Sequence, residues 1–205
     1  MMRHHRISKN NPLVLASISP RRKAILTQIG VPFQPVGSMA DETVCTEMRV
    51  ADLACQMATR KAESVQSTYK NRWILGADTL VALDKQVFGK PKDAHECHTM
   101  LLYLSGRTHR VITGFCVMDP GGKKVHLEAI LTKVKVKELS KSEIEGYVKT
   151  GESFGKAAAY AIQGIGSFMI ERLNGSYTNV VGLPVCEVVR ALIKCGALKG
   201  FPLIE

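Results

Sequence analysis

The feature that most constrains the fold is a buried strand that runs directly into a helix start. Residues 13–16 (LVLA) form a short apolar run, and residues 17–20 (SISP) follow at once. A serine followed by proline at the first helical position is a strong helix start, and Gly30 marks where that helix should end. The chain is therefore expected to build its core from a strand–turn–helix unit whose helix N-terminus is exposed.

Helical and strand-like patterns alternate along the rest of the chain. We expect a helix over about 47–65, then a strand over 73–77 that residues 80–83 extend, then a helix capped by Asp93. Strands over 110–118 and 125–136 follow. A capping box at 140–143 begins a further helix, which ends near Gly151, and a short strand at 168–170 and a helix over 184–194 complete the chain. Residues 119–122 (DPGG) predict a hairpin turn between the two central strands. Strands interleaved with helices and one hairpin predict an α/β fold with a mixed sheet.

The composition is that of a globular chain with an excess of positive charge. Of 205 residues, 45% are hydrophobic, which excludes a disordered chain and a collagen-like repeat. The longest apolar runs are far shorter than the roughly 20 residues that a membrane-spanning helix needs. The chain has 28 basic and 18 acidic residues. This excess favours an anionic partner or, equally, a solvated basic surface that serves solubility.

The sequence predicts one domain over residues 11–205, preceded by a flexible basic tail over residues 1–10. Six cysteines are present without a C-x-x-C pair, and no hydrophobic signal segment stands at the N-terminus. These observations favour a cytoplasmic protein with reduced thiols.

The turn over residues 17–23 carries the first chemical signal. Arg21, Arg22 and Lys23 crowd the first turn of a helix, where the helix dipole already makes the environment positive. A bound anion would resolve this conflict, because free N–H groups, the hydroxyl groups of Ser17 and Ser19 and the guanidinium groups would converge on it. The alternative is that the long side chains swing into solvent.

Four further residues carry weaker signals of the same chemistry. Asp78 stands at the C-terminal end of a predicted strand, where ligands collect in α/β sheets, and it could hold a divalent metal or activate a water molecule. Glu42 is a candidate second carboxylate. Lys61 on an apolar helical stripe and Lys90 in a rigid Gly-Lys-Pro loop could each reach a phosphate. The alternatives are a turn aspartate, a loop lysine and a lysine that snorkels past the edge of the core.

Five blocks of sequence occur in order between about residues 11 and 196. They are 17–22 (SISPRR); 76–79 (GADT) with 89–91 (GKP); 104–106 (LSG) with His109, Val111 and 113–114 (TG); 156–164 (KAAAYAIQG); and 179–184 (NVVGLP). Together they resemble the Maf-like proteins, the septum-formation family of nucleotide pyrophosphatases. One residue departs from the family pattern, because Ala158 stands where the family usually has glycine. The methyl group of Ala158 could reduce the space for a group that approaches the backbone at this position.

The resemblance implies a fold similar to that of the inosine-triphosphate pyrophosphatases, an elongated mixed sheet with flanking helices in two lobes around a cleft. It implies hydrolysis of nucleoside triphosphates to the monophosphate and pyrophosphate with a divalent metal cation (Mg, Mn or Co). Asp78 would be the general base and a metal ligand, with Glu42 as the second ligand. The implied substrate-binding residues are Ser17, Ser19, Arg21, Arg22, Lys61, Thr79, Lys90, Lys156 and Gln163. The family associates Arg22, Thr79 and Gln163 with substrate choice.

The segment over residues 156–164 resembles the branch of the family that hydrolyses dTTP and UTP rather than 7-methyl-GTP. The side-chain amide of Gln163 offers one acceptor and one donor group, which suit the N3–H and a carbonyl of uracil or thymine. We therefore expect dTTP and UTP as substrates, with modified pyrimidine nucleotides as further candidates.

A competing hypothesis is a non-catalytic protein that binds nucleic acid or regulates cell division through its basic surface. It predicts polynucleotide affinity that falls steeply with salt, and no turnover. Few aromatic residues lie among the basic clusters, which argues against stacking on single strands. We prefer the enzyme, with a nucleoside triphosphate as its partner, neither membrane nor nucleic acid as partners, and a second copy of the chain as a candidate for a homodimer.

Overall fold

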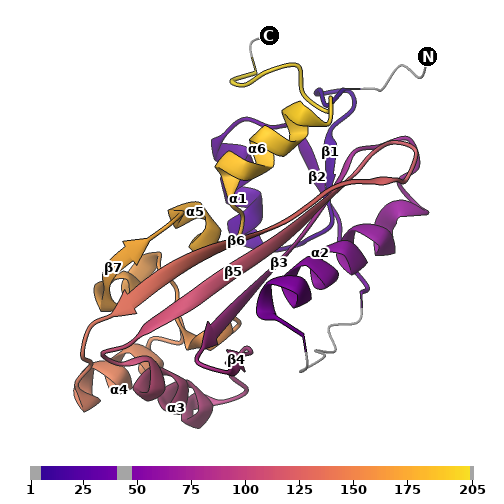
Figure 1. Ribbon diagram of the computed structural model, residues 1–205. Coiled ribbons are helices and arrows are strands. Elements are labelled where there is room, and N and C mark those ends of the chain that lie inside the picture. Colours follow the sequence, from indigo (N-terminus) through magenta and orange to yellow (C-terminus); the bar gives the residue numbers. More distant parts are fainter. Residues whose placement is uncertain (1–5, 41–47, 204–205) are drawn as a thin grey trace. The chain divides into compact units, whose positions relative to one another are not determined.

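The computed structural model describes residues 6–40 and 48–203 and shows an α/β fold (Figure 1). A mixed seven-stranded sheet has the strand order β2-β1-β3-β5-β6-β7, with β4 paired to β3. The elements are β1 (Leu13–Leu15), α1 (Pro20–Gln28), β2 (Phe33–Pro35), α2 (Val50–Gln66), β3 (Ile74–Leu83), β4 (Gln86–Phe88), α3 (Ala94–Leu104), β5 (Thr108–Met118), β6 (Lys124–Val136), α4 (Lys141–Lys149), the 3-10 helices η1 (Ala157–Ala159) and η2 (Gly164–Met169), β7 (Ile170–Asn174), α5 (Tyr177–Val181) and α6 (Val185–Lys194). The predicted class, α/β with a mixed sheet, is confirmed.

The described chain groups into two compact units. Unit 1 takes the described residues of Met1–Asp78, Thr113–Ile130 and Gly182–Glu205, and unit 2 takes Thr79–Ile112 and Leu131–Val181. We expected a flexible tail over residues 1–10. Within its described part, Ile7 is buried and donates its N–H to the carbonyl oxygen of Ala197, so the packed chain begins before residue 11.

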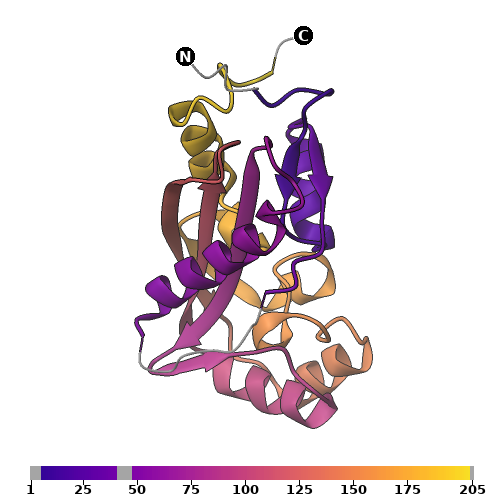
Figure 2. The same ribbon diagram turned by 90° about the vertical axis from the view of Figure 1, so that its right-hand side faces the viewer.

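In unit 1, helices cover both faces of the sheet. The strand β1 pairs in parallel with β2 and with β3. The helices α1 and α6 lie on one face, and α2 lies on the other (Figures 1 and 2). The core beneath α2 is built from small and medium side chains, which include Val14, Ala16, Ala58, Ala62 and Cys116.

The helix α2 lies close to the sheet because two strand positions carry glycine. A Cβ atom added at Gly76 of β3 would stand 2.2 Å from the carbonyl oxygen of Ala58. One added at Gly114 of β5 would stand 2.3 Å from the carbonyl carbon of Ala54. Atoms cannot approach so closely, so any larger residue at either position would push the helix away. The two glycines therefore set the distance of α2 from the sheet.

Unit 2 has its own core, in which α3 and α4 pack with strand residues such as Val81 and Val134. The two predicted caps of this unit, at Asp93 and Ser140, are confirmed. The Asp93 side chain accepts the N–H of Glu96 at 2.8 Å, and Ser140 and Glu143 form a reciprocal capping box at the start of α4. The caps satisfy N–H groups that have no partner inside their helices.

Three sequence-based expectations need correction. The strand β3 continues from Ile74 through Leu83, so Asp78 lies in the middle of a strand and not at its end. The reason is that buried residues continue on both sides of Asp78 and keep the strand pattern intact. Within the described residues, α2 begins at Val50 and β7 begins at Ile170, both later than expected.

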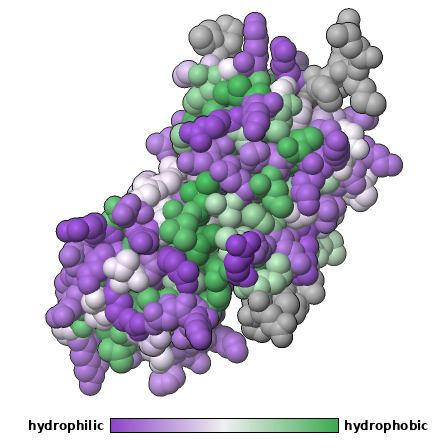
Figure 3. Space-filling model, in the orientation of Figure 1, coloured by the Kyte–Doolittle hydropathy of each residue, from purple (hydrophilic) through white to green (hydrophobic). Residues whose placement is uncertain are grey.

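The surface is largely hydrophilic in the view of Figure 3, with hydrophobic atoms exposed along the line of β6. Exposed apolar side chains of that strand include Leu127 and Leu131. Among the described residues, no helix combines the length and the apolar character that a membrane crossing requires.

We predict that Gly76→Ala and Gly114→Ala each lower the free energy of unfolding by about 1–3 kcal/mol, because the added methyl group overpacks the contact with α2. Urea unfolding followed by circular dichroism measures the change. The control is Gly146→Ala, since Gly146 lies within α4 and open space surrounds the position of its missing Cβ. That substitution should stabilise the protein by about 0.5–1 kcal/mol. Unchanged stability in both strand variants would show that the glycines do not set the position of α2.

Candidate active site

A largely buried ion pair joins two of the predicted site residues in unit 1. The Nζ atom of Lys61 on α2 donates to Oδ1 of Asp78 on β3 at 2.6 Å, and the two side chains are only 12% and 13% exposed. Lys61 therefore does not snorkel into solvent. Gly76 and Asp78 lie on the same face of β3, so the close approach of α2 at Gly76 also brings Lys61 to Asp78. Removing one partner of such a pair leaves an uncompensated charge, which typically costs about 3–5 kcal/mol.

The turn between β1 and α1 is held by a buried serine–arginine contact. The Ser17 hydroxyl oxygen accepts the N–H of Ser19 at 3.2 Å and Nη1 of Arg22 at 3.2 Å. The Nε atom of Arg22 donates to the carbonyl oxygen of Gly182 at 2.8 Å. Ser17 and Arg22 are both buried, so Arg22 does not extend into solvent. These two residues shape the turn that exposes the N-terminus of α1.

The register of the sheet places this turn next to the ion pair within unit 1. Leu15 pairs with Leu75 in the parallel β1–β3 ladder, and the N–H of Ala16 donates to the carbonyl oxygen of Leu75 at 2.9 Å. The turn that begins at Ser17 therefore leaves β1 at the level where β3 approaches Asp78. Unit 1 thus places the turn that holds Ser17 and Arg22 one strand away from the Lys61–Asp78 pair, at a similar level of the sheet.

Arg21 occupies an environment that favours an anion. Burial lowers the pKa of its guanidinium group from the usual value, because a cation loses hydration there. The first turn of α1, which lies wholly within the described residues, contains no acidic residue, and Ser19 makes no side-chain cap hydrogen bond. A partly desolvated arginine at a helix N-terminus is suited to phosphate oxygens.

The donor set partly fits a divalent metal cation. Asp78 supplies carboxylate oxygens, the donor type that Mg²⁺ and Mn²⁺ prefer. Its Oδ1 accepts the Lys61 hydrogen bond, so Oδ2 is the atom that would face a cation. The predicted second ligand, Glu42, lies outside the described residues. Within the described ranges, no group of three or more His, Cys, Asp or Glu side chains could hold a metal.

In unit 2, hydrogen bonds join the segments that carry the predicted residues Lys90 and Lys156. The N–H of Ala158 donates to the carbonyl oxygen of Gly89 at 2.9 Å, which links the two loops. The Nζ atom of Lys156 donates to the backbone carbonyl oxygen of Glu152. Two other predicted site residues belong to this unit. Thr79 on β3 is half-buried, and Gln163 is exposed.

Ala158 shows why a glycine suits its position. Its backbone is left-handed, with φ 59° and ψ 25°, a conformation that costs a residue with a Cβ atom about 1–2 kcal/mol. Its methyl group is fully buried in the core of unit 2. The N–H still reaches Gly89, so the link between the two loops survives the departure from glycine.

Sequence reasoning missed two contacts in unit 2. His109 and Tyr160 lie in the matched blocks, but their side chains form a buried hydrogen bond of 2.7 Å between Nε2 and the hydroxyl oxygen. Burial lowers the pKa of His109 to about 4, so the ring is neutral at pH 7. The Glu152 carboxylate accepts the N–H groups of Ile165 at 3.1 Å and Gly166 at 2.8 Å. Glu152 leaves no sequence pattern, because its partners are backbone groups distant in the sequence. His109, in contrast, lies in one of the matched blocks, which could have pointed to it.

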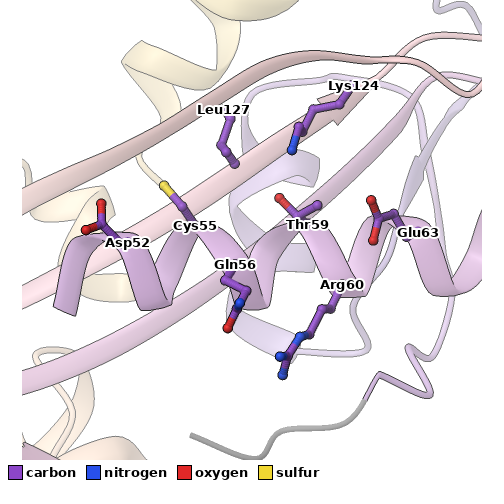
Figure 4. Close-up of a pocket in the computed structure, with 8 residues that line it drawn as sticks. All are labelled: Asp52, Cys55, Gln56, Thr59, Arg60, Glu63, Lys124 and Leu127. Carbon is purple, nitrogen blue, oxygen red and sulfur yellow. The ribbon is translucent and has the colours of Figure 1, made fainter. Parts of the chain in front are cut away.

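A depression of about 480 Å³ lies elsewhere on unit 1, between α2 and β6 (Figure 4). Asp52, Cys55 and Thr59 point from the helix toward Leu127 and Lys124 of the strand. Its lining mixes acidic and basic side chains, so it has no evident preference for an anion. No predicted site residue that the structure describes lines this depression.

Comparisons with known proteins agree with the sequence blocks. A family model described as "Maf-like protein" matches residues 12–195. The relatives include dTTP/UTP pyrophosphatases of Syntrophotalea carbinolica (47% identity, covering 92% of this chain and 87% of that protein), Geobacter sp. strain M21 (46%, 93% and 98%) and Halalkalibacterium halodurans (42%, 88% and 94%). A solved structure, the nucleoside-triphosphatase or dITP/XTP pyrophosphatase of Mycobacterium abscessus, is similar over 91% of this chain and 97% of that one. The sequence identity is 16% and the TM-score is 0.41, so nothing further is concluded from this similarity. Because the family model spans most of the sequence and the relatives match nearly end to end, the chain belongs to the Maf-like protein family.

Proposed function

We propose that the chain hydrolyses nucleoside triphosphates, chiefly dTTP and UTP, to the monophosphate and pyrophosphate with a divalent metal cation. The observation that carries this proposal is the buried Lys61–Asp78 pair next to the turn with Arg21 and Arg22. A carboxylate suited to proton transfer and arginines suited to phosphate binding on neighbouring strands of unit 1 support the proposal. The names of the relatives supply the pyrimidine triphosphates as the substrate class.

In this proposal, Asp78 acts as the general base. Its carboxylate accepts a proton from a water molecule as the water oxygen bonds to the α-phosphorus. The bond between that phosphorus and the bridging oxygen breaks, and the oxygen leaves with pyrophosphate. The Lys61 hydrogen bond to Oδ1 holds the carboxylate in a fixed orientation.

The remaining residues bind and orient the nucleotide. Arg21 and the N-terminus of α1 bind phosphate oxygens, while Ser17 and Arg22 maintain the turn and the Arg22 guanidinium adds positive charge. A divalent metal, when bound, offsets the negative charge of the phosphates. In unit 2, Lys90 and Lys156 supply further positive charge. The exposed amide of Gln163 is available to hydrogen-bond the base.

We predict that the purified chain releases pyrophosphate from UTP and dTTP in the presence of Mg²⁺, Mn²⁺ or Co²⁺. A coupled pyrophosphate assay over a panel of canonical and modified nucleotides measures kcat/KM, and EDTA should abolish turnover. A higher kcat/KM for 7-methyl-GTP or ITP than for UTP would overturn the choice of base. No turnover of any nucleotide, together with salt-sensitive polynucleotide binding, would instead support the non-catalytic hypothesis.

We further predict that Gln163→Ala reduces the preference for UTP over CTP by about tenfold, since one or two neutral hydrogen bonds contribute roughly 0.5–1.5 kcal/mol each. The ratio of the two kcat/KM values is the measurement. Gln86→Ala is the matched control, because Gln86 is also exposed but lies on β4. An unchanged ratio in Gln163→Ala would show that this amide does not select the base.

A further inference from the structure

We propose that Glu152 is a positioning residue that fixes the nucleotide-recognition segments of unit 2 relative to each other. This inference rests on the proposed function, in which Lys156 and Gln163 contact the nucleotide. Glu152 lies in the turn that follows α4 and is remote in sequence from the segment that it binds.

The carboxylate of Glu152 holds the chain just after Gln163. Its Oε1 atom accepts the N–H of Ile165 at 3.1 Å, and its Oε2 atom accepts the N–H of Gly166 at 2.8 Å. Each oxygen thus binds a different backbone N–H, which fixes the direction of the segment as well as its distance.

The ionised form of Glu152 is the one that these contacts stabilise. Burial alone would raise the pKa of this carboxyl group, but the hydrogen bonds from Gly166 and Ile165 outweigh it and lower the pKa. The carboxylate therefore remains charged at neutral and mildly acidic pH. The contacts should be lost only as the pH falls through this lowered pKa.

Glu152 also binds Lys156, one of the lysines of the proposed nucleotide site. The backbone carbonyl oxygen of Glu152 accepts the hydrogen bond from Nζ of Lys156. Two residues further along, the N–H of Ala158 binds the carbonyl oxygen of Gly89, which precedes Lys90. Glu152 consequently connects the Gln163 segment to the Lys156 loop, and Ala158 in turn links that loop to the loop of Lys90.

The conformation of Gly164 supports this arrangement independently. Its φ is +70°, and a Cβ atom added there would stand 2.2 Å from Oε1 of Glu152. The residue between Gln163 and the two bound N–H groups therefore has to be small for the carboxylate to reach them. Gln163 itself is exposed, so packing of its own side chain does not fix its place. Its backbone position depends on the neighbours that Glu152 binds.

A fixed backbone matters here because base selection depends on paired hydrogen bonds. A recognition group must be held to within about 0.5 Å to discriminate between similar ligands. If the segment loosens, the amide of Gln163 can adapt to a wrong base. Loss of Glu152 should therefore affect selectivity more than the chemical step, which uses Asp78 of unit 1.

The test compares Glu152→Gln with Glu145→Gln, a matched change on α4 at an exposed glutamate whose partner is Lys141. Glutamine keeps the size of the side chain but replaces one acceptor oxygen with an NH₂ group that opposes a backbone N–H. We expect amide hydrogen exchange at Ile165 and Gly166 to become about tenfold faster or more. The UTP-to-CTP ratio of kcat/KM should fall by about tenfold. Glu145→Gln should leave both unchanged.

A second pair of variants covers the case in which Glu152→Gln does not fold. Gly164→Ala should displace the carboxylate and give the same two changes. Gly30→Ala is its control, since Gly30 has φ +71° and open space at its Cβ position. Exchange reports on the contact whether or not the protein is active, whereas pyrophosphate release by the unmodified chain tests the proposed function. If exchange stays slow, or if selectivity is retained in an active variant, the role of Glu152 is refuted.

Discussion

The close approach of α2 to the sheet is the constraint on which the proposed chemistry of unit 1 depends. Gly76 and Gly114 leave no side chain between the helix backbone and the strands. The helix can therefore lie low enough for Lys61 to reach Asp78 at 2.6 Å. A single added methyl group in this contact would move a charged partner as well as disturb packing. The small residues that let α2 pack closely on the sheet are thus also needed to hold the Asp78 carboxylate in place.

The two units contribute different kinds of interaction. Unit 1 contributes charged groups. The Lys61–Asp78 pair supplies a carboxylate, and the turn between β1 and α1 supplies arginine side chains suited to phosphates. Unit 2 contributes hydrogen bonds to Glu152 from Lys156, Ile165 and Gly166, which hold the segments proposed to recognise the nucleotide. Substitutions in unit 1 should therefore alter catalysis and phosphate binding. Substitutions around Glu152 should alter the choice of base.

The sequence predicts those features whose physical causes are local. Capping by Asp93 and Ser140 depends on residues three positions away, so both caps are found correctly. The position of Asp78 within a strand is missed, because strand continuity depends on buried residues on both sides. The contacts of the Glu152 carboxylate are also missed, since its partners lie 13 and 14 residues away and are backbone groups. Contacts that the tertiary fold creates leave no short-range pattern.

The role of Asp78 is the central claim, and Asp78→Asn tests it most directly. The amide keeps the shape of the carboxylate and an oxygen for Lys61, but it cannot accept the proton. Pyrophosphate release from UTP should fall by about 100-fold or more. The Kd of a non-hydrolysable UTP analogue, measured by calorimetry without metal, should change by less than about threefold. Loss of binding as large as the loss of rate, or turnover that persists in a folded variant, would contradict the assignment of Asp78 as the general base.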